Sequence, residues 1–241
     1  MYLWKCWRDT RGSFFIFLGA LLAAGAYGAY VKFDPFGAIA AKPMESRFVW
    51  QGLANVLLNM TVELVPVAGF ILGALGVGME FEKGTADFLL TRPRARRRFL
   101  WTSWGLGAAQ MIALALLSLA GNWLTRNASS PTVFGLGSVN VRLLAAMSVL
   151  ALLCYTVTCL MTTLARNSRN GTALALVAIS AYTALYWWLR LWYEIKIPIF
   201  WDLLERAART AEFPFTAVVG WLTVCLALMF VAQFRLDRAE V

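Results

Sequence analysis

The sequence predicts an all-α integral membrane protein that crosses the bilayer six times. Of its 241 residues, 60% are apolar and only 15% are charged, whereas soluble domains are about 45–50% apolar and about 25% charged. The apolar residues also stand in long blocks, and a helix needs about 20 of them to cross a hydrocarbon core of about 30 Å. A water-soluble fold could not bury this much apolar surface, so we expect a single transmembrane domain over residues 1–241.

Six apolar blocks are long enough to be spans. They are Ser13 to Val31, Met60 to Met79, Leu100 to Leu124, Leu143 to Ala165, Gly171 to Tyr193 and Thr216 to Phe234. The second block begins near Phe48 and covers about 32 residues, or about 48 Å of helix, which exceeds the membrane core. We therefore assign residues 48–59 to a part that projects beyond the core or lies in the interface.

The distribution of basic residues predicts that both termini are cytoplasmic. Thirteen of the 22 Lys and Arg residues lie at the termini or in the gaps after spans 2 and 4, and cytoplasmic loops carry the excess of positive charge. The gap after span 5, with Lys196, Arg206 and Arg209, opposes this assignment. The N-terminal segment also resembles a cleavable leader ending at Ala24-Gly25-Ala26. Because its apolar stretch continues to Val31, we interpret it as a retained first span in the cell membrane.

The sequence lacks the residues that several kinds of catalytic and metal-binding site require. The chain contains no histidine, which excludes His-ligated haem, the usual zinc sites and His-based nucleophile triads. Its four cysteines form no C-x-x-C pair and are interpreted as apolar packing residues rather than metal ligands. No P-loop motif is present, so ATP-driven work would need another subunit. We expect a chain without catalytic or metal-binding residues.

Glu63 is the only acidic residue inside a predicted span. Intramembrane carboxylates often serve ion or proton movement, but Glu63 is expected near the outer interface, where its side chain could reach the headgroups. Pro66, three residues later, removes one helical hydrogen bond and predicts a kink. Glu63 and Pro66 are therefore candidates for a transport pathway, with a purely structural role as the alternative.

The loop between spans 2 and 3 has a distinctive local pattern. Gly84 can end a helix, Thr85 can cap a new one, and Pro93 disfavours its continuation. The short helix so predicted, residues 86–91, presents Phe88, Leu89 and Leu90, and Arg94, Arg96, Arg97 and Arg98 follow. An apolar-faced cytoplasmic helix is what docking to a soluble partner requires, although a loop lying in the membrane interface would look similar. Nucleic acid is a poor partner, because two spans hold the arginines at the membrane.

This loop resembles that of the type-2 ATP-binding-cassette (ABC-2) exporter permeases. The matching residues are Glu80 at the end of span 2, Gly84-Thr85, Leu89-Leu90, Pro93 and Arg96. The resemblance implies a coupling helix that sits in a groove of an ABC ATPase subunit. It also implies the residues of that contact: Glu80, Glu82, Gly84, Thr85, Phe88, Leu89, Leu90, Arg92, Pro93 and Arg96. Ala86 and Asp87 depart from the family, which commonly has Leu and Glu there.

The same resemblance implies the assembly. Two permease subunits, identical or homologous, would form the exporter's substrate pathway, and two ATPase subunits would bind ATP and Mg. Two further elements fit the family. Leu3, Trp4 and Trp7 share one face of a helix before span 1, similar to an N-terminal elbow helix. Residues 201–211, after Pro198, form an amphipathic pattern that predicts a short outer helix.

Two other functions remain open at this stage. A secondary transporter or ion pathway would use Glu63 as its coupling carboxylate, and inverted repeats would support it, but none is visible in the sequence. A membrane enzyme acting on lipid is disfavoured, because histidine and clustered carboxylates are missing.

Overall fold

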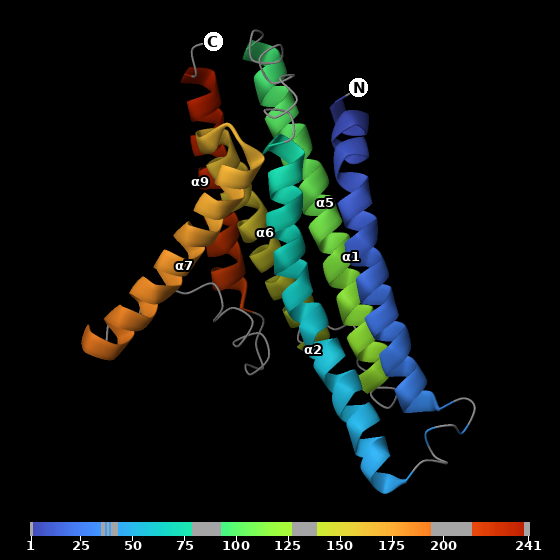
Figure 1. The fold of residues 1–241 in the computed structure, drawn as a ribbon. Coiled ribbons are helices and arrows are strands. Elements are labelled where there is room, and N and C mark those ends of the chain that lie inside the picture. Colours follow the sequence, from blue (N-terminus) through green and yellow to red (C-terminus); the bar gives the residue numbers. More distant parts are fainter. Residues whose placement is uncertain are drawn as a thin grey trace.

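The computed structural model describes residues 2–34, 37, 39, 43–78, 93–126, 139–193 and 214–238 (Figure 1). These residues form long helices and no strand, which confirms the predicted all-α class. The helices are α1 (Tyr2–Phe33), α2 (Met44–Gly73), the π-helix η1 (Ala74–Gly78), α5 (Pro93–Arg126), α6 (Val139–Ala165), α7 (Ser168–Tyr193) and α9 (Phe215–Arg238).

Five of the helices are long and apolar enough to cross a membrane. Their apolar segments are Leu3–Phe33, Arg97–Gly121, Arg142–Ala165, Ser168–Leu189 and Phe215–Arg238. The second predicted span, Met60 to Met79, overlaps a shorter apolar segment of the described residues, Glu63–Gly78. The described residues therefore form a multi-pass helical membrane architecture with five candidate spans, and span 2 stays a prediction.

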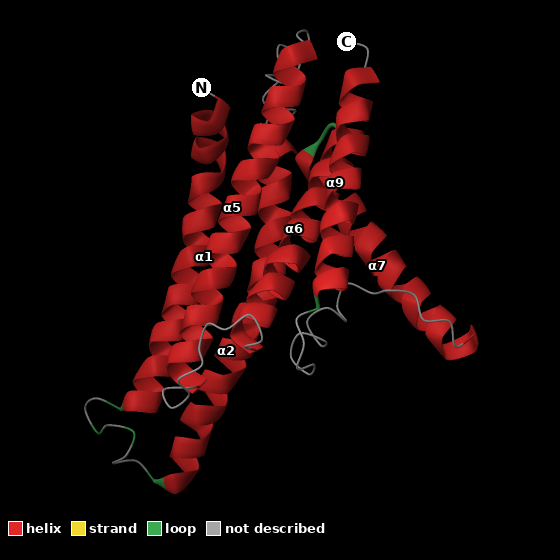
Figure 2. Cartoon of the chain, turned by 180° about the vertical axis from the view of Figure 1, so that it is seen from behind, coloured by secondary structure: helices red, strands yellow, loops and turns green. Residues whose placement is uncertain are grey.

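Helix α6 lies at the centre of the bundle. Of an apolar stretch of 18 residues in α6, 72% are buried, against 11% of such a stretch in α7 and 17% in α9. Helix α6 packs against α2, α5, α7 and α9, while α1 packs against α2 and α5. Figures 1 and 2 show that α7 diverges from the other helices toward its C-terminal end and that both chain termini lie at one end of the bundle.

The helix boundaries differ from the predicted spans in informative ways. Helix α1 runs unbroken from Tyr2, so the structure does not separate an elbow helix from span 1. Helix α5 begins at Pro93, because the fixed φ and missing N–H of proline suit the first helical position. Helix α7 begins after Asn167, whose side-chain Oδ1 accepts hydrogen bonds from the N–H groups of Arg169 at 2.8 Å and Asn170 at 3.3 Å. This is an ordinary N-cap.

Tyr155 of α6 fills the space where α2, η1 and α5 meet. Its side chain is 1% exposed, and its hydroxyl donates a 2.9 Å hydrogen bond to the carbonyl oxygen of Ser103 in α5. Glycines surround it because nothing larger fits: a Cβ at Gly73 would lie 2.7 Å from the Tyr155 carbonyl oxygen, and one at Gly107 would overlap the ring. Close backbone approach at small residues is how membrane helices commonly associate.

Helix α5 is hydrogen-bonded through side chains to four other helices. Each bond is between 2.8 and 3.0 Å long. The pairs are Gln110–Thr10 with α1, Ser118–Thr61 with α2, Trp104–Thr156 with α6, and Trp101–Gln233 with α9. Such interhelical bonds stabilise membrane proteins by about 0.6 kcal/mol each on average, and together they fix the position of α5.

Candidate functional site

Most of the predicted ATPase contact lies outside the described residues. Residues 79–92 contain Glu80, Glu82, Gly84, Thr85, Phe88, Leu89, Leu90 and Arg92, and they are among the residues that the structure does not describe. The predicted outer helix at 201–211 also lies outside the described part. Pro93 and Arg96 belong to the first turn of α5. The prediction of a coupling helix is therefore neither supported nor contradicted by the fold.

The structure does place both ends of this loop. Gly78, at the end of η1, lies so close to the start of α7 that a Cβ there would be 2.8 Å from the Cβ of Ser168. Pro93, at the start of α5, lies at the end of the bundle that carries both termini (Figure 1). The loop thus connects a segment packed on α6 and α7 with the helix that is hydrogen-bonded to α1, α2, α6 and α9.

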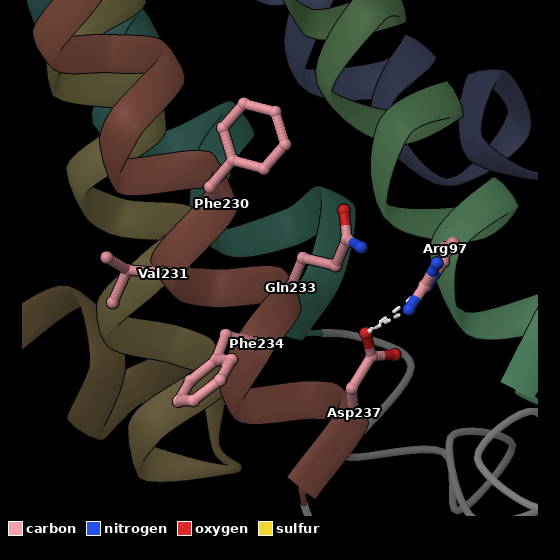
Figure 3. Close-up of a pocket in the computed structure, with 6 residues that line it drawn as sticks. All are labelled: Arg97, Phe230, Val231, Gln233, Phe234 and Asp237. Carbon is pink, nitrogen blue, oxygen red and sulfur yellow. Dashed lines mark hydrogen bonds and ion pairs between the residues drawn. The ribbon is translucent and has the colours of Figure 1, made fainter.

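At the same end, α5 and α9 are joined by an ion pair beside an open groove. The Nη2 atom of Arg97 lies 3.0 Å from Oδ2 of Asp237, and Nε donates to the same oxygen at 3.2 Å. Figure 3 shows the groove, which has a volume of about 420 Å³. Its lining residues are Arg97, Phe230, Val231, Gln233, Phe234 and Asp237. Sequence analysis placed Arg97 in an arginine cluster at the membrane surface but gave no sign that Asp237 pairs with it.

Glu63 lies on an exposed face of α2. Its neighbours on this face are apolar and are spaced alternately by four and three residues as far as Val67. The set is Val49, Leu53, Val56, Met60, Glu63, Val67 and Ile71, all exposed. A repeat of 3.5 residues is the pattern by which one helix packs along another. We call this set the α2 seam.

The depth of Glu63 follows from a hydrogen bond between neighbouring helices. Ser118 donates to Thr61 at 3.0 Å, so these two residues lie at the same level. Three residues later the uninterrupted apolar run of this sequence reaches Gly121, and the polar residue Asn122 follows. At a rise of 1.5 Å per residue, Glu63 lies about 8 Å inside that end. This agrees with a position near the outer interface and leaves both interpretations of Glu63 open.

Pro66 does not share the exposed face of Glu63. It is buried within the bundle, and α2 continues through it to Gly73 without interruption. The predicted kink stays a prediction, whereas a departure from α-helical geometry occurs at η1. π-Helical segments of this kind are frequent at functional sites.

Sequence analysis did not identify the Tyr155 contact as part of the bundle's core. A signal was present, because Gly69 and Gly73 form a G-x-x-x-G pattern in α2, the spacing that brings two membrane helices together. In the structure these glycines face Ala151 and Tyr155 of α6.

Among the residues that the structure describes, the remaining chemistry-bearing side chains form no further site. All four cysteines are buried, as packing residues would be. In the part of the chain that the structure describes, no group of three His, Cys, Asp or Glu side chains could hold a metal ion.

Comparison of the chain with protein-family models, with curated proteins and with solved structures finds no match. The candidate sites above therefore rest on the residues and their geometry.

Proposed function

We propose that this chain is the membrane-spanning permease subunit of an ABC exporter in the cell membrane, with both termini in the cytoplasm. It would form the substrate pathway and couple to separate ATPase subunits, which bind ATP and Mg. The observation that carries this proposal is the sequence pattern of the loop from Glu80 to Arg96, which predicts a capped, apolar-faced helix.

The packing of the helices provides a route for coupling. A partner that moves the loop acts directly on Pro93 and hence on α5, and the hydrogen bonds of α5 carry the displacement to α1, α2, α6 and α9. Because packed helices move as rigid bodies rather than deforming continuously, a displacement at one end of α5 reaches the other end of the bundle. No catalytic residue is needed in this chain for that role.

The α2 seam supports a second permease subunit as part of the assembly. A carboxylate that faces lipid is costly, so charged side chains within spans face other helices or a water-filled cavity. Glu63 lies on the exposed side of this subunit, and its apolar neighbours have the spacing of a helix-packing seam. A second copy or a homologue packed along α2 would place Glu63 at the subunit interface, where the pathway is expected.

The experiment is co-purification of this chain with the ATPase encoded beside it, followed by measurement of ATP hydrolysis. The test variant is Phe88→Ala with Leu89→Ala. A matched control is Phe15→Ala with Ile16→Ala, which removes a similar adjacent aromatic–aliphatic pair from exposed positions on α1. We expect loss of ATPase binding or of coupled hydrolysis in the test variant alone.

Two results would argue against the proposal. If no P-loop ATPase co-purifies under any nucleotide condition, the proposal that this chain is an ABC permease fails. If both double variants lose the ATPase equally, the loss reports general destabilisation, and the loop has no special role.

A secondary transporter or ion pathway is the second candidate, and the exposed position of Glu63 in a largely apolar segment favours it. Under this alternative, Glu63→Gln abolishes transport by the isolated chain in vesicles. Under the ABC proposal the same variant still assembles with the ATPase and retains most of its activity.

A further inference from the structure

The groove between α5 and α9 has one polar and one apolar part. Its polar part is formed by Arg97, Gln233 and Asp237, and its apolar part by Phe230, Val231 and Phe234 (Figure 3). The apolar side chains are exposed, Phe230 to 59%. A volume of about 420 Å³ is within the range of sites that hold small molecules. The groove could therefore hold a ligand with a polar and an apolar end.

The two parts follow the expected membrane boundary. In α5 the apolar residues begin at Phe99, directly after Arg97 and Arg98, and the last turn of α9 carries Arg235 and Arg238. Phe230 lies seven residues before Asp237, about 10 Å further toward the membrane centre. The polar part thus lies at headgroup depth, and the apolar part lies where acyl chains begin.

The charge around the groove selects an anion. Arg97, Arg98, Arg235 and Arg238 are the four basic residues of these two helix ends whose side chains are described, against one carboxylate, Asp237. The guanidinium carbon of Arg238 lies 3.9 Å from the ring centroid of Phe234, which holds a second cation beside the groove. Each arginine at this depth favours anionic lipid over neutral lipid.

The hydrogen-bond geometry leaves donors for a phosphate. A guanidinium carries five N–H donors, and Arg97 uses its Nε and Nη2 atoms toward Asp237. The side-chain oxygen of Gln233 accepts from Trp101 Nε1 at 2.8 Å, so its NH₂ group is the part that can donate to a ligand. Asp237 orients Arg97 across the groove, although its negative charge also weakens the attraction for an anion.

We propose that this groove binds one anionic phospholipid of the cytoplasmic leaflet. Its phosphate lies on Arg97, with Gln233 and Arg238 beside it, and its acyl chain follows Phe230 and Val231. The ligand class is set by the combination of surplus arginine charge with exposed aromatic side chains at the membrane boundary. The inference does not depend on the ABC proposal, because a lipid bound here would stabilise the α5–α9 contact in any transporter.

The test is native mass spectrometry of the full-length protein in detergent, titrated with equal amounts of dioleoyl phosphatidylglycerol and dioleoyl phosphatidylcholine. We expect the protein to retain one phosphatidylglycerol molecule in preference to phosphatidylcholine. Arg97→Gln should lower this preference about fivefold, the effect of one arginine at a membrane surface. Val231→Trp, which fills the apolar part, should lower it as well. Arg8→Gln is the control, because Arg8 is an exposed arginine at the same end of the bundle but on α1.

Asp237→Asn separates lipid binding from a purely structural ion pair. Both Arg97→Gln and Asp237→Asn break the pair, but only Asp237→Asn keeps the arginine and removes the competing charge, so it should retain or raise the preference for phosphatidylglycerol. Equal losses in Arg97→Gln and Arg8→Gln, or equal retention of the two lipids by the parent protein, would overturn the proposal. Competition by glycerol phosphate at the concentration of the lipid would show that the headgroup alone is bound, and would also overturn it.

Discussion

Replacing Gly107 with alanine adds one methyl group against the ring of Tyr155. A Cβ at this position would overlap the ring carbons and the hydroxyl. The ring cannot move away freely, because Tyr155 is 1% exposed and its hydroxyl donates to the Ser103 carbonyl at 2.9 Å. Overpacking of this kind costs about 1–3 kcal/mol, and breaking the hydrogen bond adds about 1 kcal/mol. Alanine regains up to about 1 kcal/mol through its higher helix propensity. We therefore expect a net loss of about 1–3 kcal/mol in the free energy of unfolding.

Gly105 provides the matched control, two residues away in the same helix. A Cβ at Gly105 would have no heavy atom within 4 Å, so Gly105→Ala should be neutral or stabilising by up to about 1 kcal/mol. Both variants can be compared by titrating the protein in mixed micelles with dodecyl sulfate and following tryptophan fluorescence. Under this treatment Gly107→Ala should unfold at a lower dodecyl sulfate fraction than the parent, and Gly105→Ala should not.

A double-mutant cycle tests whether contact with Tyr155 causes the loss of stability in Gly107→Ala. In a Tyr155→Leu background the ring is gone, so Gly107→Ala should become nearly as well tolerated as Gly105→Ala, giving a coupling energy of about 1–3 kcal/mol. The reasoning fails if the two alanine variants have the same stability in the parent protein, or if the cost at Gly107 is unchanged without the tyrosine.

Three further predictions concern packing in the bundle. Gly69→Ala should destabilise the protein by about 1–3 kcal/mol in the same titration, because the new Cβ meets the backbone of Ala151, which cannot rotate away. Trp104→Phe should cost about 0.6 kcal/mol, since it removes the 2.9 Å hydrogen bond to Thr156 while keeping an aromatic ring; an unchanged midpoint would show that this bond contributes nothing. Cys6 is 2% exposed near the N-terminal end of α1, so a water-soluble maleimide should label it only after unfolding; rapid labelling of the native protein would contradict the packing of that end.

The approximate place of five membrane helices could be predicted from the sequence, because a helix that crosses the bilayer needs an apolar block of matching length. Their ends could not, since helices continue past the apolar block wherever polar residues keep helical geometry. Helix α5 begins at Pro93, seven residues before the predicted span, and α2 begins at Met44, sixteen residues before it. The π-helix η1 was not predicted, because a stretch of small apolar residues also fits an ordinary α-helix, and tertiary packing decides between them.

The candidate sites were predictable only where they are local in sequence. The loop pattern around Gly84 and Thr85 depends on neighbouring residues, so it can be recognised without a fold. The Arg97–Asp237 pair joins residues 140 positions apart, and only the packing of α9 against α5 brings them together. The α2 seam lies between these cases: its spacing is visible in the sequence, but that it remains exposed in the folded subunit depends on which face α6 covers.

The helices on the two sides of the loop at 79–92 are held in different ways. On one side, α5 is hydrogen-bonded to α1, α2, α6 and α9. On the other side, η1 packs on α6 and α7, with Gly78 against Ser168 at the start of α7. Helix α7 is only 11% buried over an apolar stretch of 18 residues and diverges from the bundle (Figure 1). A displacement of the loop therefore acts on a firmly bound group of helices at Pro93 and, through Gly78, on the least buried helix. A change in the angle of that helix alters the contacts of α7 with α6 and η1, whereas the side-chain hydrogen bonds that join α5 to α1, α2, α6 and α9 do not involve α7 and stay intact.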